Sequence, residues 1–166
     1  MALNLSRKEQ MLLQDQKKHE QICVQKYQSY ANQTQTPQLK QLFTNYAQAE
    51  QQHLNTINQI LSGQVPDVQQ QGQQQNQQGQ QQNQQGSGQP AGAGSPSAFA
   101  GGPNDAALLN DMLMTEKYVS GTYDTAIFEF ADPSVRQVLN HIQKEEQEHG
   151  EGLFKYMQSQ GLYNVQ

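Results

Sequence analysis

Apolar residues recur every three or four positions in two parts of the chain, one near each end. The N-terminal part contains the series Leu39, Leu42, Phe43, Tyr46, Leu54, Ile57, Ile60 and Leu61. The C-terminal part contains similar series from Leu109 to Phe130 and from Val135 to Met157. This spacing places the apolar side chains along one face of a helix that packs against a core. The chain is therefore predicted to be all-α.

Residues that flank the apolar series carry the signals of helix ends. Ser6 and Glu9 have the spacing of a capping box, in which each side chain accepts a hydrogen bond from the other residue's backbone N–H. Thr36 and Asp132 each precede a proline, which is typical of an N-cap followed by proline at the first helical position. These signals predict helices over residues 6–34, 37–62, 105–130 and 133–160.

The segment between the two helical parts has a different composition. Residues 64–104 hold 15 of the 35 glutamines, and the heptapeptide QQQNQQG occurs twice in succession from Gln73. No apolar residue lies within the repeated heptapeptide, and the Gln/Asn/Gly composition predicts that the segment is a disordered linker. A flexible chain of this length spans roughly 35 Å, close to the roughly 39 Å of the second helix. The linker can therefore start the third helix parallel to the second, as in ferritin-like bundles.

The two helical parts are also related to each other by an internal repeat. A shift of 96 positions aligns them without a gap, and it matches Tyr27 with Tyr123 and Pro37 with Pro133. Chance similarity between two amphipathic hairpins is the alternative explanation. The repeat predicts two antiparallel helical hairpins, residues 1–63 and 105–166, which together form one ferritin-like four-helix bundle around the crossover 64–104.

Ionisable residues interrupt the apolar faces at equivalent positions of the two hairpins. They are Glu20, Glu50, His53, Glu116, Glu146 and His149. Burial of four unpaired carboxylates would cost many kcal/mol, and two divalent ions would balance their charge. Di-iron and di-manganese bundles use this ligand set: one Glu from each of two helices and Glu-x-x-His from each of the other two. The six residues are therefore candidate ligands of two Fe or Mn ions.

Positions along the helices support this assignment. Glu20 and Glu50 lie about equally far from the turn near Thr36, and Glu116 and Glu146 are placed likewise around Asp132. Antiparallel packing would set each pair side by side. An empty core network that shares protons among the same residues remains the alternative.

Residues near the six candidates are interpreted more simply. Glu145 and Glu148 are expected to be surface charges, and His19 and His141 to lie on the surface or rim. Tyr27 and Tyr123 are expected to pack in the core. For Gly150 and Gly152 two interpretations stay open: they admit a close neighbour next to the site, or they mark a fraying helix.

Charge and cysteine content exclude several functional classes. The formal net charge is −5 and no basic patch is evident, so nucleic-acid binding is not expected. No apolar run approaches the roughly 20 residues that span a bilayer. The first ten residues, MALNLSRKEQ, lack the apolar centre of a secretory signal peptide. Cys23 is the sole cysteine, so no intrachain disulfide can form.

The C-terminal hairpin resembles the Coat F family of spore coat proteins. The resemblance runs from Leu108 to Tyr163 and includes the stretch DMLMTEKYVSGTYDTAIFEFADPSVRQVLNHIQKEEQEHGEGLF. Its landmarks are Asp111, Glu116, Lys117, Tyr118, Tyr123, Pro133, Arg136, Glu145, Glu146, Gln147, His149, Gly161, Leu162 and Tyr163.

The resemblance implies a ferritin-like bundle that is made in the mother-cell cytoplasm without a secretion signal and placed in the spore coat. It implies other coat proteins as partners, and a homo-oligomer is possible in principle. The expected function is a structural coat component rather than an enzyme. The alternative is a di-iron or di-manganese carboxylate protein: an oxidase, a peroxide scavenger or a metal-binding protein.

Overall fold

The computed structural model describes residues 3–67, 102 and 104–163 of the chain. Over these residues the chain forms helices α1 (Arg7–Gln33), α2 (Pro37–Leu61), α4 (Asp105–Glu129) and α5 (Pro133–Ser159). Each predicted helix differs from the observed one by a single residue at one or both ends. The prediction of an all-α chain is therefore confirmed.

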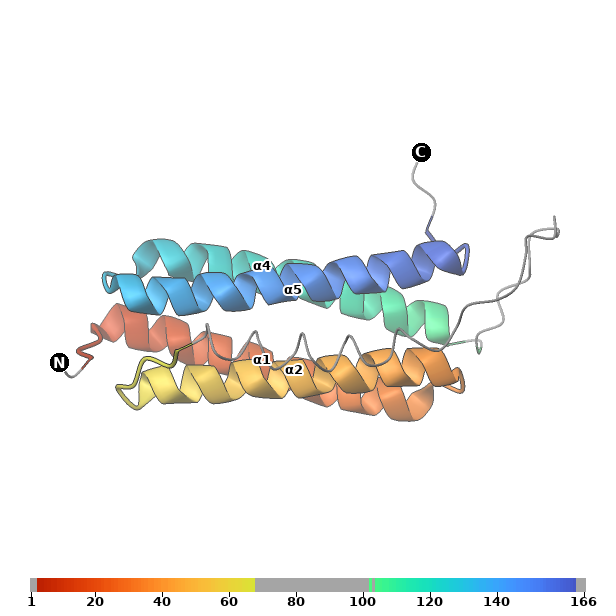
Figure 1. The fold of residues 1–166 in the computed structure, drawn as a ribbon, viewed down its shortest axis with the longest axis horizontal. Coiled ribbons are helices and arrows are strands. Elements are labelled where there is room, and N and C mark those ends of the chain that lie inside the picture. The colour runs from red at the N-terminus through yellow and green to blue at the C-terminus, as the bar shows by residue number, and fades with distance from the viewer. Residues whose placement is uncertain (1–2, 68–101, 103, 164–166) are drawn as a thin grey trace.

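The helices form a four-helix bundle of two antiparallel hairpins, α1 with α2 and α4 with α5 (Figure 1). The hairpins meet through contacts of α1 with α4 and of α2 with α5. The end of α2 and the start of α4 lie at opposite ends of the bundle, so the two helices run parallel (Figure 1). The predicted disorder of the 64–104 crossover stays a prediction, because residues 68–101 and 103 lie outside the described residues.

Helix ends follow the sequence signals with one exception. Ser6 and Glu9 form the predicted capping box, and the Asp132 carboxylate accepts hydrogen bonds from the first backbone N–H groups of α5. Thr36 precedes α2 as predicted, but its side chain makes no capping bond. Its hydroxyl instead donates to the Asp105 carboxylate at 2.6 Å, because the start of α4 packs against this turn.

Two buried acidic residues tie the start of each hairpin to the turn of the other. Glu9 accepts a hydrogen bond from the Ser6 N–H at 2.7 Å and from the Ala131 N–H at 2.9 Å. Asp105 accepts one from the Gly102 N–H at 3.2 Å in addition to the one from Thr36. Glu9 and Asp105 are themselves related by the 96-residue shift. The repeat therefore includes contacts that join the two hairpins.

The core has two apolar layers with a polar centre between them. One layer lies toward the turn between α4 and α5 and includes Ile57 and Leu139. The other lies toward the turn between α1 and α2 and includes Phe43 and Leu153. The candidate ligands occupy the positions between these residues along α2 and α5. None of the described helices is both long and apolar enough to cross a membrane.

The contacts of Glu9 predict a pH-dependent contribution to stability. Burial alone would raise the pKa of Glu9, but hydrogen bonds from Ser6 and Ala131 outweigh it and lower the pKa. A carboxylate with a lowered folded-state pKa stabilises the fold above its ordinary pKa of 4.5 and loses that effect as the pH falls through the folded value. We expect Glu9→Gln to lower the free energy of unfolding by about 1–2 kcal/mol at pH 7, with a smaller difference in acid.

Urea unfolding at pH 7 and at about pH 3.5, below the ordinary glutamate pKa of about 4.3, measures this difference. The control is Glu148→Gln, because Glu148 is exposed and its contact with Lys144 joins two exposed side chains; it should change stability by less than about 0.5 kcal/mol. An equal loss for Glu9→Gln at both pH values would show that the carboxylate charge plays no part.

Candidate metal centre

The six candidate ligands converge in the middle of the bundle. Each of the four helices contributes one carboxylate, and α2 and α5 each add a histidine one helical turn further along. All six side chains are buried, and the most exposed residue, His149, retains 6% of its surface. The predicted register of the two hairpins is therefore correct. The metal-ligand role of these residues stays a prediction.

The cluster divides into two groups of four residues. One comprises Glu20, Glu50, His53 and Glu146; the other comprises Glu50, Glu116, Glu146 and His149. Within each group the possible ligand atoms all lie within 4.8 Å of one another. Glu50 and Glu146 belong to both groups, so the arrangement suits two ions that share these two carboxylates.

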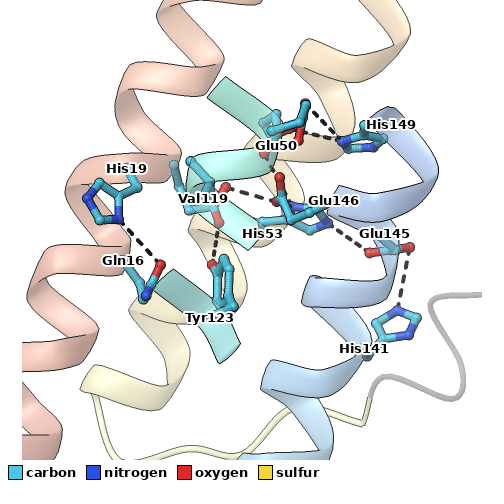
Figure 2. A network of polar contacts seen from close by, with 12 residues as sticks. Gln16, His19, Glu50, His53, Val119, Tyr123, His141, Glu145, Glu146 and His149 are labelled. Carbon is cyan, nitrogen blue, oxygen red and sulfur yellow. Dashed lines mark hydrogen bonds and ion pairs between the residues drawn. The ribbon is translucent and has the colours of Figure 1, made fainter. Parts of the chain in front are cut away.

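Each histidine reaches across to the glutamate of the other hairpin. His53 Nδ1 lies 2.9 Å from Glu146 Oε1 and 3.3 Å from Glu50 Oε2. His149 Nδ1 lies 3.0 Å from Glu50 Oε1. Figure 2 shows the two imidazole rings near Glu50 and Glu146. The expected contact between Glu50 and His53 within α2 is thus present. In addition, His53 contacts Glu146 and His149 contacts Glu50 across the two hairpins.

Tyr27 and Tyr123 connect the hairpins a second time. The Tyr27 hydroxyl donates to Glu116, and the Tyr123 hydroxyl donates to Glu20. Both tyrosines are fully buried in the apolar layers, so the expected packing role is confirmed. Each also satisfies one carboxylate oxygen, and the two contacts are equivalent under the 96-residue shift.

Three buried carboxylate oxygens accept no hydrogen bond within the described part of the chain. They are Glu20 Oε2, Glu116 Oε2 and Glu146 Oε2. A buried acceptor without a partner costs about 1–3 kcal/mol, and more when it is charged. Divalent iron and manganese bind carboxylate oxygens and imidazole nitrogens, and the cluster offers four carboxylates and two imidazoles. The residues present therefore fit a pair of such ions.

Burial raises the pKa values of two of the cluster's carboxyl groups and so favours their neutral form. It raises the pKa of Glu20 to about 8 and the pKa of Glu146 well above its usual range. For Glu50 the hydrogen bonds from His149 and His53 outweigh burial and hold the pKa well below its usual range.

The pKa values of the two histidines are raised, although burial alone would lower them. Burial opposes the charged imidazole, but hydrogen bonds to Glu145 and Glu146 raise the pKa of His53 well above its usual range. Hydrogen bonds to Glu116 and Glu50 raise the pKa of His149 to about 9. Without metal, bound protons therefore provide much of the charge compensation.

Glu145 is not the simple surface charge that the sequence suggested. Its Oε2 lies 2.8 Å from His53 Nε2, its Oε1 lies 3.5 Å from His141 Nε2, and its side chain is only 14% exposed. Figure 2 shows Glu145 between the two histidines. A carboxylate on the outer nitrogen fixes the imidazole tautomer and turns the other nitrogen toward the cluster. The expected rim position of His141 agrees with its partial exposure of 26%.

Gly152 admits a close neighbour of the site, which settles the open interpretation of this glycine. A Cβ at this position would lie 1.8 Å from the Tyr46 hydroxyl oxygen. The Tyr46 ring in turn packs on the His149 ring with a centroid distance of 4.4 Å. Helix α5 continues to Ser159, so the glycine does not mark a frayed end.

Comparisons with known proteins agree with the C-terminal resemblance and with the fold. Residues 104–166, which include the C-terminal hairpin, match the Coat F domain. The chain is also 36% identical over 63 residues to the uncharacterized protein YusN of Bacillus subtilis (strain 168). That alignment covers 38% of this chain and 57% of the relative, so the chain spans little more than half of the relative's length.

A solved structure shows the class of fold. The bundle superposes on the crystal structure of wild-type KatB, a manganese catalase from Anabaena, with a TM-score of 0.68. The superposition covers 100% of this chain and 82% of the catalase chain, at 20% sequence identity. The predicted ferritin-like fold is thereby confirmed. The centre of the bundle in this chain holds buried clusters of carboxylates and histidines of the kind that suit a pair of metal ions.

The close approach at Gly152 predicts opposite effects for two alanine substitutions on α5. Alanine favours a helix over glycine by about 1 kcal/mol, but Gly152→Ala must displace Tyr46 from His149. We expect Gly152→Ala to lower the free energy of unfolding by about 1–3 kcal/mol. Gly150→Ala is the matched control, because a Cβ there meets its nearest atom at an ordinary 3.8 Å. It should stabilise the protein by up to about 1 kcal/mol; similar urea midpoints for the two variants would contradict the packing described here.

Proposed function

We propose that this chain is a component of the endospore coat whose bundle binds two divalent iron or manganese ions. The observation that carries the metal proposal is the pair of four-residue groups that share Glu50 and Glu146. Three oxygens within these groups support it, because ion binding would satisfy acceptors to which no residue in the described ranges donates a hydrogen bond.

The chain's own residues divide naturally between two ions. Glu20 and His53 would hold one, Glu116 and His149 the other, and Glu50 and Glu146 would be shared. The four carboxylate charges then balance two divalent cations. When bound, such a pair supplies Lewis acidity and reversible one-electron oxidation. Glu145 would hold the proton of His53 at Nε2 and keep Nδ1 free for a metal ion.

The coat role rests on the match of residues 104–166 to the Coat F domain. The bundle would serve as a rigid block in the coat, and the glutamine-rich segment would connect it to other coat proteins. Synthesis in the mother cell, deposition on the spore and self-association belong to the same proposal. A structural role and metal binding are compatible, because the ligands lie inside the bundle and leave its surface available.

A second candidate function is redox catalysis, as an oxidase or a peroxide scavenger. The shared fold with a protein described as a manganese catalase favours its consideration. At 20% identity that likeness concerns the fold alone, so the specific support is the chain's own set of four carboxylates and two imidazoles. Peroxide consumption by the metal-loaded chain, absent from the metal-free chain, would distinguish this candidate from a structural role.

Substitution of the shared carboxylates separates metal binding from an empty network. Glu50→Gln combined with Glu146→Gln keeps side-chain volume and removes two negative charges. If metals bind, the wild type should hold about two ions per chain and melt higher with Fe²⁺ or Mn²⁺, and the variant should lose both properties. In an empty network the same change should be neutral or stabilising near pH 7.

Elemental analysis and calorimetric unfolding, with and without added metal, measure these outcomes. The matched control is Glu148→Gln combined with Glu151→Gln, which makes the same change of formal charge at side chains that are 56% and 58% exposed. This control should keep the full metal content. A metal-free wild type that is indifferent to both ions, together with a stabilised double variant, would eliminate the metal proposal and leave the coat role.

The coat proposal predicts where the protein is found during sporulation. An epitope-tagged chain, expressed from its own promoter in a spore-forming host that encodes it, should appear in the mother cell and then in the alkaline detergent extract of purified spore coats. An established coat protein and a mother-cell enzyme serve as fractionation controls. Tagged chain that stays with the mother-cell enzyme and is absent from mature spores would contradict the coat role.

A further inference from the structure

A cavity between α4 and α5 leads from the molecular surface to the buried cluster. Its volume is about 480 Å³, which lies within the range of small-molecule sites. The exposed residues Lys117 and Glu151 are part of its wall on the surface side, and the cluster residues Glu116 and Glu146 are part of it on the inner side. The cavity therefore extends from the surface to the outer side of two residues of the candidate metal centre.

The inner end of this cavity carries unsatisfied acceptors. Glu116 and Glu146 are 1% and 0% exposed, and each has a buried oxygen that accepts no hydrogen bond from residues 3–67, 102 and 104–163. Because these oxygens are themselves shielded from solvent, the cavity ends against the two side chains and does not expose their oxygens. A ligand in the cavity would thus lie next to the group formed by Glu50, Glu116, Glu146 and His149.

The internal repeat pairs small residues that line this cavity with larger residues in the other hairpin. The 96-residue shift pairs Gly150 with Leu54 and Ser120 with Val24. Gly150 and Ser120 line the cavity, whereas Val24 is buried and Leu54 half-buried in the other hairpin. The cavity described between α1 and α2 is lined by residues such as Ala31 and Ala47 and touches none of the six cluster residues. Gly150 and Ser120 are thus smaller than the residues at the equivalent positions of the other hairpin, and they leave space for the cavity between α4 and α5.

We propose that the cavity between α4 and α5 is the entry route and binding site for a small uncharged molecule that reaches the metal pair. The route to a metal rests on the proposed function; the cavity itself does not. The side chains of Lys117 and Glu151 carry opposite charges, so the mouth favours neither anions nor cations. Leu113 and Phe154 give the walls an apolar surface, and the Tyr163 ring packs edge-to-face on Phe154 at 5.0 Å.

Filling the cavity with the side chain found in the other hairpin tests this proposal. Gly150→Leu introduces the residue of the equivalent position 54, and a Cβ at Gly150 fits without a clash. Ser120→Val, which copies Val24, is a second and milder variant. The control is Gly121→Leu, which adds the same side chain to a helical glycine with no atom within 4 Å of the added Cβ.

The first measurement uses nitric oxide, an uncharged ligand of ferrous ions, with iron-loaded protein of verified metal content. We expect Gly150→Leu to slow the spectral change in a stopped-flow experiment by about tenfold or more, Ser120→Val to slow it less, and Gly121→Leu to leave it unchanged. Wild-type rates in Gly150→Leu at full metal content would overturn the entry route.

The second measurement does not depend on metal. Crystals of the metal-free protein under xenon pressure should show xenon in the cavity of the wild type and of Gly121→Leu, and none in Gly150→Leu, because apolar cavities bind this gas. A wild type that binds no iron would refute the proposed metal function, and the xenon result alone would then decide the binding site. An empty wild-type cavity under xenon would overturn the proposed binding site.

Discussion

Burial of four carboxylates at the centre of a small helical bundle is the constraint on which the rest of the structure depends. Two apolar layers close over the polar centre from both ends of the bundle, so water cannot solvate these groups. Histidines, tyrosine hydroxyls and bound protons compensate for part of the charge, and three oxygens have no hydrogen-bond partner among the described residues. A cluster of this kind is costly for an empty core and suited to a pair of divalent ions.

The internal repeat explains how the chain builds such a centre from two similar hairpins. Two kinds of contact between the hairpins occur in equivalent pairs: Tyr27 with Glu116 corresponds to Tyr123 with Glu20, and Glu9 at one turn corresponds to Asp105 at the other. These contacts set the two hairpins in one register, which brings all six candidate ligands together in the middle of the bundle.

Departures from the repeat give the two halves of the cluster different surroundings. His53 has Glu145 on its outer nitrogen, whereas the residue equivalent to Glu145 in the other hairpin is Ala49, which offers no acceptor. His149 instead packs on the ring of Tyr46, in the space left by Gly152. The cavity opens toward the half that contains His149, because Gly150 stands where the other hairpin has Leu54. The two candidate ion positions are therefore chemically distinct.

Most of the fold and the convergence of the six candidate ligands could be predicted from the sequence, because they depend on local signals and simple counting. Capping residues and prolines set the helix ends to within one residue, and equal distances from a turn set the register within each hairpin. The role of Glu145 was missed because its contact with His53 depends on how α2 packs against α5, which no pattern within α5 reveals. Thr36 differed from expectation for the same reason, since its partner Asp105 begins another helix. The different surroundings of His53 and His149 depend on how the helices pack against one another, which the sequence repeat alone does not reveal.

The central claim is that the buried cluster holds two metal ions, and anomalous X-ray scattering tests it most directly. Crystals of protein purified from cells supplied with iron and manganese would be measured above and below the absorption edge of each metal. The account predicts two anomalous peaks, one beside Glu20 and His53 and one beside Glu116 and His149, each in contact with Glu50 and Glu146. An ordered cluster with these side chains in place and no anomalous peak at either edge would contradict it.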